Sequence, residues 1–170
     1  MTRVPVGMTV NGREQAEFVE SGTILVDFLR DKLGLYATKV GCQQGTCGSC
    51  TVTIDGELAL SCLVPAERAN GRSVVTLEGI MPDGGLHPLQ RAFASGFASQ
   101  CGFCSPGMIV AAKALLDRNL SPSRDDVIEA ISGNICRCTG YEPIISAVLA
   151  AAQEMRNQAL APVVNATEPA

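Results

Sequence analysis

The eight cysteines are the feature that most limits what this chain can fold into, because they form two sets of four with different spacings. The first set lies in a glycine-rich loop and shortly after it, as Cys42-x4-Cys47-x2-Cys50 followed by Cys62. The second set combines a Cys-x2-Cys pair with a later Cys-x-Cys pair, at Cys101, Cys104, Cys136 and Cys138. Four thiols are enough for one metal site, so the pattern indicates two sites in separate parts of the fold.

Composition and charge narrow the class of protein. The 170 residues are 46% hydrophobic and 18% charged, which suits a globular chain with a substantial core, and the net charge of −4 argues against a nucleic-acid binder. The slightly positive mean hydropathy suggests a surface that is partly covered by partner subunits. The first residues, 1–5, lack the apolar segment of a secretion signal, and no run approaches the ~20 apolar residues of a membrane span. We therefore expect a cytoplasmic protein, in which disulfides are disfavoured.

Residues 1–79 show the pattern of a sheet packed on one helix. Asn11-Gly12 and Asp55-Gly56 are hairpin turn signals, and apolar periodicity predicts a helix over residues 24–33. Strands are expected at residues 4–10, 14–19, 51–54, 57–62 and 74–77. This order predicts a β-grasp, ferredoxin-like domain.

Helical patterns replace the strands after Glu78. Residues 80–85 are turn-rich and indicate a linker, and the residues after 158 indicate a C-terminal tail, 159–170. Helices are expected at residues 88–97, 108–118, 125–131 and 142–155. The predicted fold class is therefore α+β, with the ferredoxin-like domain followed by a four-helix bundle over residues 86–158.

The first cysteine set has the spacing of a plant-type 2Fe–2S loop. Gly41, Gly45 and Gly48 give the loop conformational freedom and let backbone N–H groups approach the sulfurs. Zinc sites usually show paired cysteine knuckles, so the spacing favours iron and sulfide over zinc. A Rieske centre needs two histidines, and the only one here, His87, is expected to cap a helix or lie on the surface.

The second cysteine set is less specific. Cys101 and Cys104 precede Ser105-Pro106-Gly107 at an expected helix start, where the helix dipole favours thiolate. Cys136 and Cys138 lie in a turn between two expected helices. The arrangement favours a second iron–sulfur cluster but leaves zinc open.

Three motifs together resemble the xanthine oxidase family of molybdenum hydroxylases. They are the cysteine loop from Gly41 to Val52, the segment from Gln100 to Gly107, and the segment from Gly133 to Tyr141. Over about residues 4–155 the chain is similar to the small iron–sulfur subunit of the bacterial three-subunit enzymes. The family usually has threonine where Ser105 stands, a change that does not affect metal ligation.

The resemblance implies two 2Fe–2S clusters and a contact with molybdopterin. The cluster nearer FAD would be held by Cys42, Cys47, Cys50 and Cys62. The cluster nearer molybdenum would be held by Cys101, Cys104, Cys136 and Cys138. Gln100 would hydrogen-bond the molybdopterin, and Cys138 would touch it through its sulfur.

The implied function is electron transfer without catalytic residues in this chain. Electrons would leave the molybdopterin of a large partner subunit, pass through both clusters and reach FAD in a medium-sized partner, within a dimer of heterotrimers. The chain has neither a Rossmann fingerprint nor a P-loop. A free-standing ferredoxin and a zinc-stapled binding module stay open as alternatives. Residues 43–46 and 48–49 look closer to the N-heteroaromatic hydroxylases of the family than to its carbon monoxide enzymes. The expected substrate is therefore an N-heteroaromatic compound rather than an aldehyde, purine, carbon monoxide or thioester.

Overall fold

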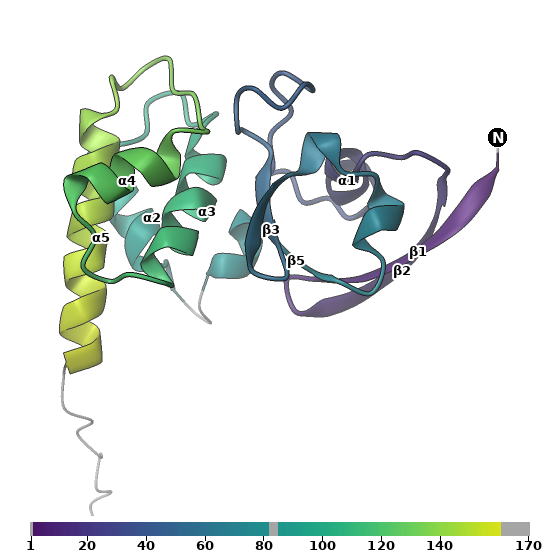
Figure 1. Ribbon diagram of the computed structural model, residues 1–170, viewed down its shortest axis with the longest axis horizontal. Helices are drawn as coiled ribbons and strands as arrows, with labels where there is room; N and C mark the ends of the chain where they lie inside the picture. Colours follow the sequence, from purple (N-terminus) through teal and green to yellow (C-terminus); the bar gives the residue numbers. More distant parts are fainter. Residues whose placement is uncertain (1, 82–84, 161–170) are drawn as a thin grey trace, which may run out of the picture.

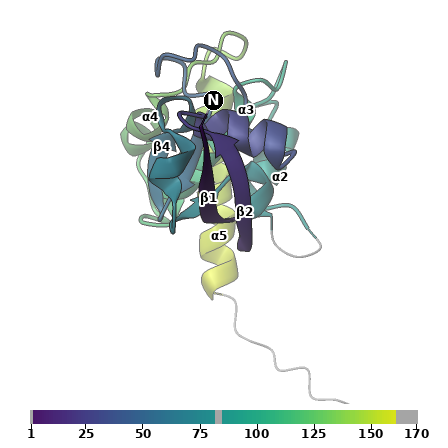
Figure 2. The ribbon, with the colours of Figure 1, turned by 90° about the vertical axis from the view of Figure 1, so that its right-hand side faces the viewer.

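The computed structural model describes residues 2–81 and 85–160, and it divides them into a sheet-containing half and a helical half (Figure 1). The predicted α+β fold class is confirmed. The β1–β2 hairpin lies at one end of the molecule and α5 at the other (Figures 1 and 2). The division at residues 79 and 86 stays a prediction, and part of the expected linker, residues 82–84, lies outside the described residues.

A five-stranded sheet forms the first half, with the strand order β2-β1-β5-β3-β4. Its strands are β1 (Arg3–Val10), β2 (Arg13–Glu20), β3 (Thr51–Ile54), β4 (Glu57–Leu60) and β5 (Ser73–Val75). Strand β1 pairs antiparallel with β2 and parallel with β5, whereas β3 pairs antiparallel with both β4 and β5. Asn11 and Asp55 have φ values of 51° and 52° and each precedes a glycine, as the predicted hairpin turns require.

The helix against this sheet is less regular than predicted. Helix α1 (Leu25–Asp27) continues as a π-helical turn over Phe28–Lys32, in which the Leu33 N–H donates to the Phe28 carbonyl at 3.2 Å. The single α-helix expected over residues 24–33 is therefore wrong in detail. Apolar spacing over ten residues does not distinguish a four-residue from a five-residue hydrogen-bonded turn. The apolar residues that predicted this helix nevertheless face the core, since Leu25, Phe28 and Leu29 have no exposed surface.

The strand expected over residues 57–62 ends early. Strand β4 stops at Leu60, and Ser61–Leu63 form a 3₁₀ turn. The hydroxyl of Ser61, which is fully buried, donates to the Cys50 carbonyl at 2.7 Å, and this contact holds the turn against the end of the cysteine loop. Cys62 is thereby buried beside Cys50.

Four helices form the second half, as predicted: α2 (Pro88–Ser95), α3 (Ser105–Leu116), α4 (Arg124–Ile131) and α5 (Glu142–Leu160). Helix α5 packs against α2 and α4, and α3 lies between the other helices and strand β3. Their shared core includes Leu89, Phe93, Met108, Leu116, Ile144 and Val148. Helix α5 continues to Leu160, two residues into the predicted tail, and the tail residues 161–170 lie outside the described residues. None of the helices in the described part of the chain is long and apolar enough to cross a membrane.

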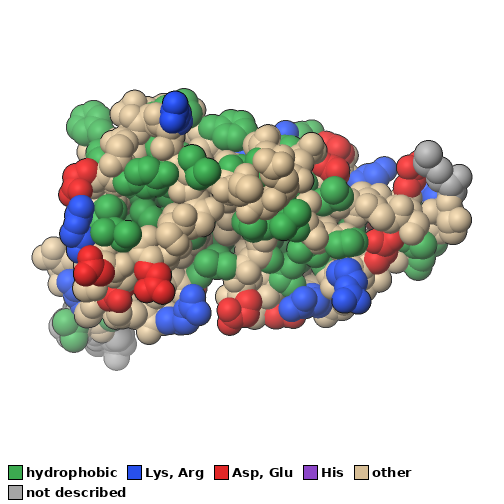
Figure 3. Space-filling view, turned by 45° about the horizontal axis from the view of Figure 1, so that its top comes forward, with side chains coloured by type: hydrophobic (Ala, Val, Ile, Leu, Met, Phe, Trp, Pro, Cys, Tyr) green, Lys and Arg blue, Asp and Glu red, His purple; other side chains and the backbone are tan. Residues whose placement is uncertain are grey.

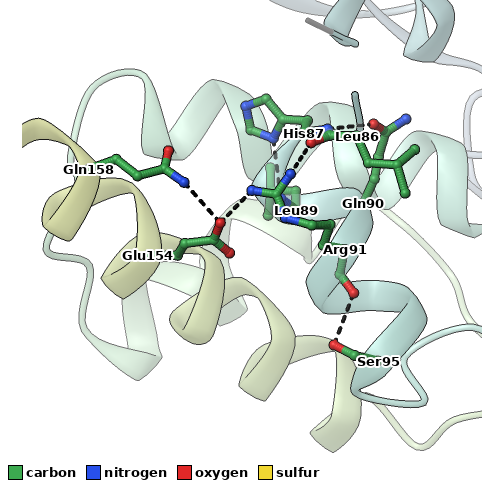
Figure 4. Close-up of polar contacts among 8 residues, drawn as sticks. All are labelled: Leu86, His87, Leu89, Gln90, Arg91, Ser95, Glu154 and Gln158. Carbon is green, nitrogen blue, oxygen red and sulfur yellow. Dashed lines mark hydrogen bonds and ion pairs between the residues drawn. The ribbon is translucent and has the colours of Figure 1, made fainter. Parts of the chain in front are cut away.

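His87 caps helix α2, as the sequence analysis expected (Figure 4). Its Nδ1 accepts a hydrogen bond from the Leu89 N–H at 3.2 Å, and its own N–H donates to the Gln90 side chain at 2.9 Å. Arg91, one turn further on, pairs with Glu154 and so ties α2 to α5. Because Nδ1 must accept, this cap requires the neutral imidazole.

We expect His87 to make stability fall as the solution becomes acidic. Burial, followed by the charge of Lys113, lowers the pKa of His87, so the unfolded chain binds this proton more readily than the folded one. The stabilisation is thus complete above the unfolded pKa of about 6.5 and is lost as the pH falls below it. His87→Ala should cost about 1 kcal/mol at neutral pH, and His87→Asn should keep the cap. Unfolding at pH 7 and pH 5 checks this, and an equal pH effect in wild type and His87→Asn would contradict it.

Candidate metal centres

The eight thiols lie in four pairs, all of them as free cysteines. The thiols in contact are Cys42 with Cys47, Cys50 with Cys62, and Cys104 with Cys136. The fourth pair is Cys101 with Cys138, whose sulfurs are 3.6 Å apart. Each predicted set of four therefore forms two pairs of thiols, and no pair joins a thiol of one set to a thiol of the other.

Each site has an inner pair of thiols that is more buried than its outer pair. In the first site Cys50 and Cys62 are 2% and 4% exposed, whereas Cys42 and Cys47 are half-buried. In the second site Cys136 is buried and Cys104 half-buried, whereas Cys101 and Cys138 are exposed. Both sites are therefore anchored in the protein on one side and accessible from outside on the other.

The outer side of the first loop is arranged to hold a thiolate. The backbone N–H groups of Gln44 and Thr46 point to the Cys42 sulfur at 3.5 and 3.3 Å. A side-chain hydrogen bond from Thr46 and these two N–H groups lower the pKa of Cys42 to about 5. Such N–H···S contacts also help to set the reduction potential of an iron–sulfur cluster.

The three glycines of this loop have different reasons to be glycine. Gly45 and Gly48 have φ values of 78° and 69°, which confirms the expected conformational freedom. Gly41 does not lie in this region, and the sequence interpretation was wrong about its reason. A side chain there would place its Cβ 2.8 Å from the Cys47 sulfur, so Gly41 provides space for the thiol.

Two of the inner thiols, Cys50 and Cys104, have a raised pKa and are protonated in the absence of a metal. Burial raises the pKa of Cys50 to about 11, and burial together with the contact to Cys136 raises the pKa of Cys104 to about 12. The expectation that the start of helix α3 favours thiolate at Cys104 is therefore wrong for the metal-free chain, because desolvation outweighs the helix dipole. A bound cation would have to displace these protons, which couples metal binding to proton release.

Tyr141 and Thr139 shape the second site, and the sequence analysis did not single them out. The Cys136 N–H donates to the Tyr141 hydroxyl at 3.0 Å, and the Thr139 hydroxyl lies 3.2 Å from the Cys136 sulfur. Burial raises the pKa of Cys136, but the hydrogen bonds from Thr139 and the backbone of Cys138 outweigh it and lower the pKa overall. Polar residues two or three positions from a ligand cysteine are the signal that could have identified them.

The two sites are joined by a tight contact between the cysteine loops. Asn134, only 5% exposed, donates to the Gly48 carbonyl at 2.8 Å, and the Ile135 N–H donates to the Cys47 carbonyl at 2.9 Å. Gly107 on α3 packs so closely on the Gly48 carbonyl that a Cβ would overlap it. The first loop is thus fixed directly to the segment that carries Cys136.

Gln100 lies at the exposed side of the second site. Both Gln100 and its neighbour Cys101 are exposed, and Cys101 pairs with the exposed Cys138. The two residues that the resemblance connects with molybdopterin, Gln100 and Cys138, thus both lie beside Cys101, one as its neighbour in the chain and the other as its thiol partner.

The thiol pairs fit iron–sulfur clusters. Two thiolates on one tetrahedral metal ion, each at about 2.3 Å, would lie about 3.7 Å apart, and the Cys101 and Cys138 sulfurs are separated by 3.6 Å. Among residues 2–81 and 85–160, no group of three or more His, Cys, Asp or Glu side chains lies in the arrangement that a single metal ion needs. A 2Fe–2S cluster takes two thiolates on each of its two irons, which is the arrangement in pairs seen here.

The fold and the paired thiols define a two-domain iron–sulfur protein. Residues 8–75 match a family model described as a 2Fe-2S iron-sulfur cluster binding domain, and residues 76–149 match one described as a 2Fe-2S binding domain. These matches cover one cysteine set each.

Similar proteins identify the family. The small subunit of nicotine 6-hydroxylase from Paenarthrobacter nicotinovorans is 46% identical over 92% of this chain and 94% of its own length. A chain of quinoline 2-oxidoreductase from Pseudomonas putida 86 superposes with a TM-score of 0.88 at 45% identity, over 92% of this chain and 98% of that one. Aldehyde oxidoreductase from Megalodesulfovibrio gigas is 49% identical over 85% of this chain, which spans only 16% of that longer protein. This chain belongs to the xanthine oxidase family of molybdenum hydroxylases, among its small iron–sulfur subunits.

Proposed function

We propose that this chain is the electron-transfer subunit of a molybdenum hydroxylase and relays electrons from a molybdopterin centre, through two 2Fe–2S clusters, to FAD in a partner subunit. This proposal rests on the two four-thiol sites, whose loops are held together by the hydrogen bond from the Ile135 N–H to the Cys47 carbonyl. A single-site carrier has no need of such a contact. The similarity to named small subunits of hydroxylases supports the same role.

The residues of this chain hold and tune the clusters. We assign Cys42, Cys47, Cys50 and Cys62 to the cluster nearer FAD, and Cys101, Cys104, Cys136 and Cys138 to the cluster nearer molybdenum. When bound, each cluster supplies a one-electron carrier. The inner pair of each site lies toward the protein interior, and in the first site the N–H groups around Cys42 stabilise negative charge on the outer side. The exposed Gln100 and Cys138 are positioned to contact molybdopterin from a partner.

The partners we propose are a large molybdopterin-binding subunit and a medium-sized FAD-binding subunit, assembled as a dimer of heterotrimers. Relatives described as small, gamma or beta subunits support a multi-subunit complex. An N-heteroaromatic substrate is favoured, because relatives are named for nicotine, nicotinate, caffeine and quinoline. We also propose a cytoplasmic location, in which eight reduced thiols are available for cluster assembly.

Iron and acid-labile sulfide analysis tests the cofactors. We expect about four irons and about four sulfides per chain, since each 2Fe–2S cluster contributes two of each. A tag on this chain should also recover a complex that contains molybdenum and flavin. Zinc without sulfide would support the zinc-stapled module, and a fully loaded chain that never associates with molybdenum or flavin proteins would support the free ferredoxin.

A further inference from the structure

The residue that closes helix α2 has an unusual backbone. Phe97 has a φ of 53°, and its side chain is 81% exposed. The Ala98 N–H donates to the Phe93 carbonyl at 3.1 Å, which forms the six-residue loop of a Schellman motif. Glycine normally occupies the left-handed position of this motif because it has no Cβ. Here glycine comes one residue earlier, as Gly96, whose φ is −90°.

Within this chain, the exposed Phe97 ring makes few contacts that would offset the cost of this backbone conformation. Asn11 and Asp55 also have positive φ, but both residue types tolerate it and both begin hairpin turns. Tyr141, at φ 69°, accepts a hydrogen bond from the Cys136 N–H through its hydroxyl. Phe97 is a bulky residue in a sterically unfavourable region, and its ring is left facing solvent. Such a combination points to a role outside this chain's own core.

The chain segment around Phe97 is poor in charge. The sequence has no charged residue between Arg91 and Lys113, although 18% of the whole chain is charged. Phe103 and Ile135, on the loops of the second site, are 47% and 52% exposed. Figure 3 brings the end of the molecule that carries the cysteine loops forward, and charged side chains lie mostly along the margins of that face. Charge depletion with exposed aromatic residues is typical of the centre of a protein interface.

We propose that Phe97 is the aromatic anchor through which the helical domain binds the molybdopterin-binding subunit. This inference rests on the proposed function. Phe97 precedes Gln100 and Cys101 in one short loop, so at most about 14 Å of chain separates it from the exposed thiol that the partner's cofactor must approach. The Ser105 hydroxyl donates to the Ser99 hydroxyl at 3.0 Å and holds this loop to α3. A partner that covers Cys101 and Cys138 therefore also covers Phe97, whose ring is already exposed in the unbound chain.

The test compares Phe97→Gly and Phe97→Ala with Phe18→Ala in the full-length, cluster-loaded chain. Phe18 is a matched control because it is 59% exposed on β2, away from the cysteine loops. The probe is the molybdenum-containing subunit separated from the native complex, and its dissociation constant is measured for each variant. We expect both Phe97 variants to bind at least tenfold more weakly and Phe18→Ala to bind like wild type. Phe97→Gly should also raise the melting temperature by about 2–4 °C, with iron content unchanged.

The opposite signs of these two effects separate an interface role from a structural one. Phe97→Gly with a lower melting temperature or less iron would show that the ring supports this chain's own fold, and the inference would fail. If the wild-type chain binds the molybdenum-containing subunit and Phe97→Gly binds it equally well, the inference fails while the proposed function stands. A wild-type chain that binds no molybdenum-containing subunit would overturn the proposed function and the inference together.

Discussion

A Cys104→Ser chain is expected to bind about two irons in place of about four, and to lose electron transfer between the molybdenum and flavin centres. Cys104 and Cys136 form the inner thiol pair of the second site. A serine there leaves three thiolates for a cluster that takes four, while the first site, in the other half of the fold, keeps its own four cysteines. Iron and sulfide analysis measures the loss, and flavin reduction by substrate in the complex measures the transfer.

The reciprocal variant, Cys62→Ser, serves as the control for the first site. It should also retain about two irons, but the electron paramagnetic resonance signal that it loses should be the one that Cys104→Ser keeps. The two variants together assign each signal to a half of the chain. A Cys104→Ser chain that still binds about four irons would remove Cys104 from the set of ligands.

Gly107→Ala is expected to destabilise the chain by about 2–3 kcal/mol, although alanine is usually the better helix residue by about 1 kcal/mol. A Cβ on Gly107 would overlap the Gly48 carbonyl oxygen and come within 2.9 Å of the Asn134 amide nitrogen. The Gly48 carbonyl belongs to the backbone of the cysteine loop, so it cannot move away as a flexible side chain could. The melting temperature should fall by roughly 5–10 °C, and hydrogen exchange at the Ile135 amide should become faster.

Gly133→Ala is the matched control for this prediction. Gly133 lies in the same contact region, but an added Cβ there would meet no atom within 4 Å. Its melting temperature and its exchange at Ile135 should match those of the wild type. If Gly107→Ala were as stable as Gly133→Ala, the close approach of α3 to the cysteine loop would not contribute to stability.

The cysteine spacing predicted more of the site than any other feature of the sequence. Ligand spacing in a loop is local, so two sets of four could be recognised before the fold was known. Which thiols pair, and which pairs are buried, depends on where Cys62 and Cys136 arrive in space, and spacing does not contain that information. The preference for iron over zinc at the second site likewise became firm only with the match of residues 76–149 to a 2Fe-2S binding domain, because a sulfur separation of 3.6 Å fits two thiolates on either metal ion.

Other functional residues were missed because their partners are distant in sequence. Asn134 looks like an ordinary turn residue, but its amide binds the Gly48 carbonyl, 86 positions away. Phe97 was expected to end a helix, whereas α2 stops at Ser95 and Phe97 occupies the glycine position of the cap. The sequence does contain a signal, since Gly96 stands one residue before the position where this cap normally has glycine. That signal can be interpreted only once the φ of Phe97 is known.

The central position of strand β5 determines when the sheet can close during synthesis. The β1–β2 and β3–β4 hairpins are local, but they join only through β5, which lies between β1 and β3 and is the last strand in the chain. During synthesis the sheet therefore stays open until residue 75 has left the ribosome, by which time the four cysteines of the first site have all emerged. The thiols of the first site are thus outside the ribosome before the sheet beside them closes, whereas the contacts from Asn134 and Ile135 that fix their loop form only later in synthesis.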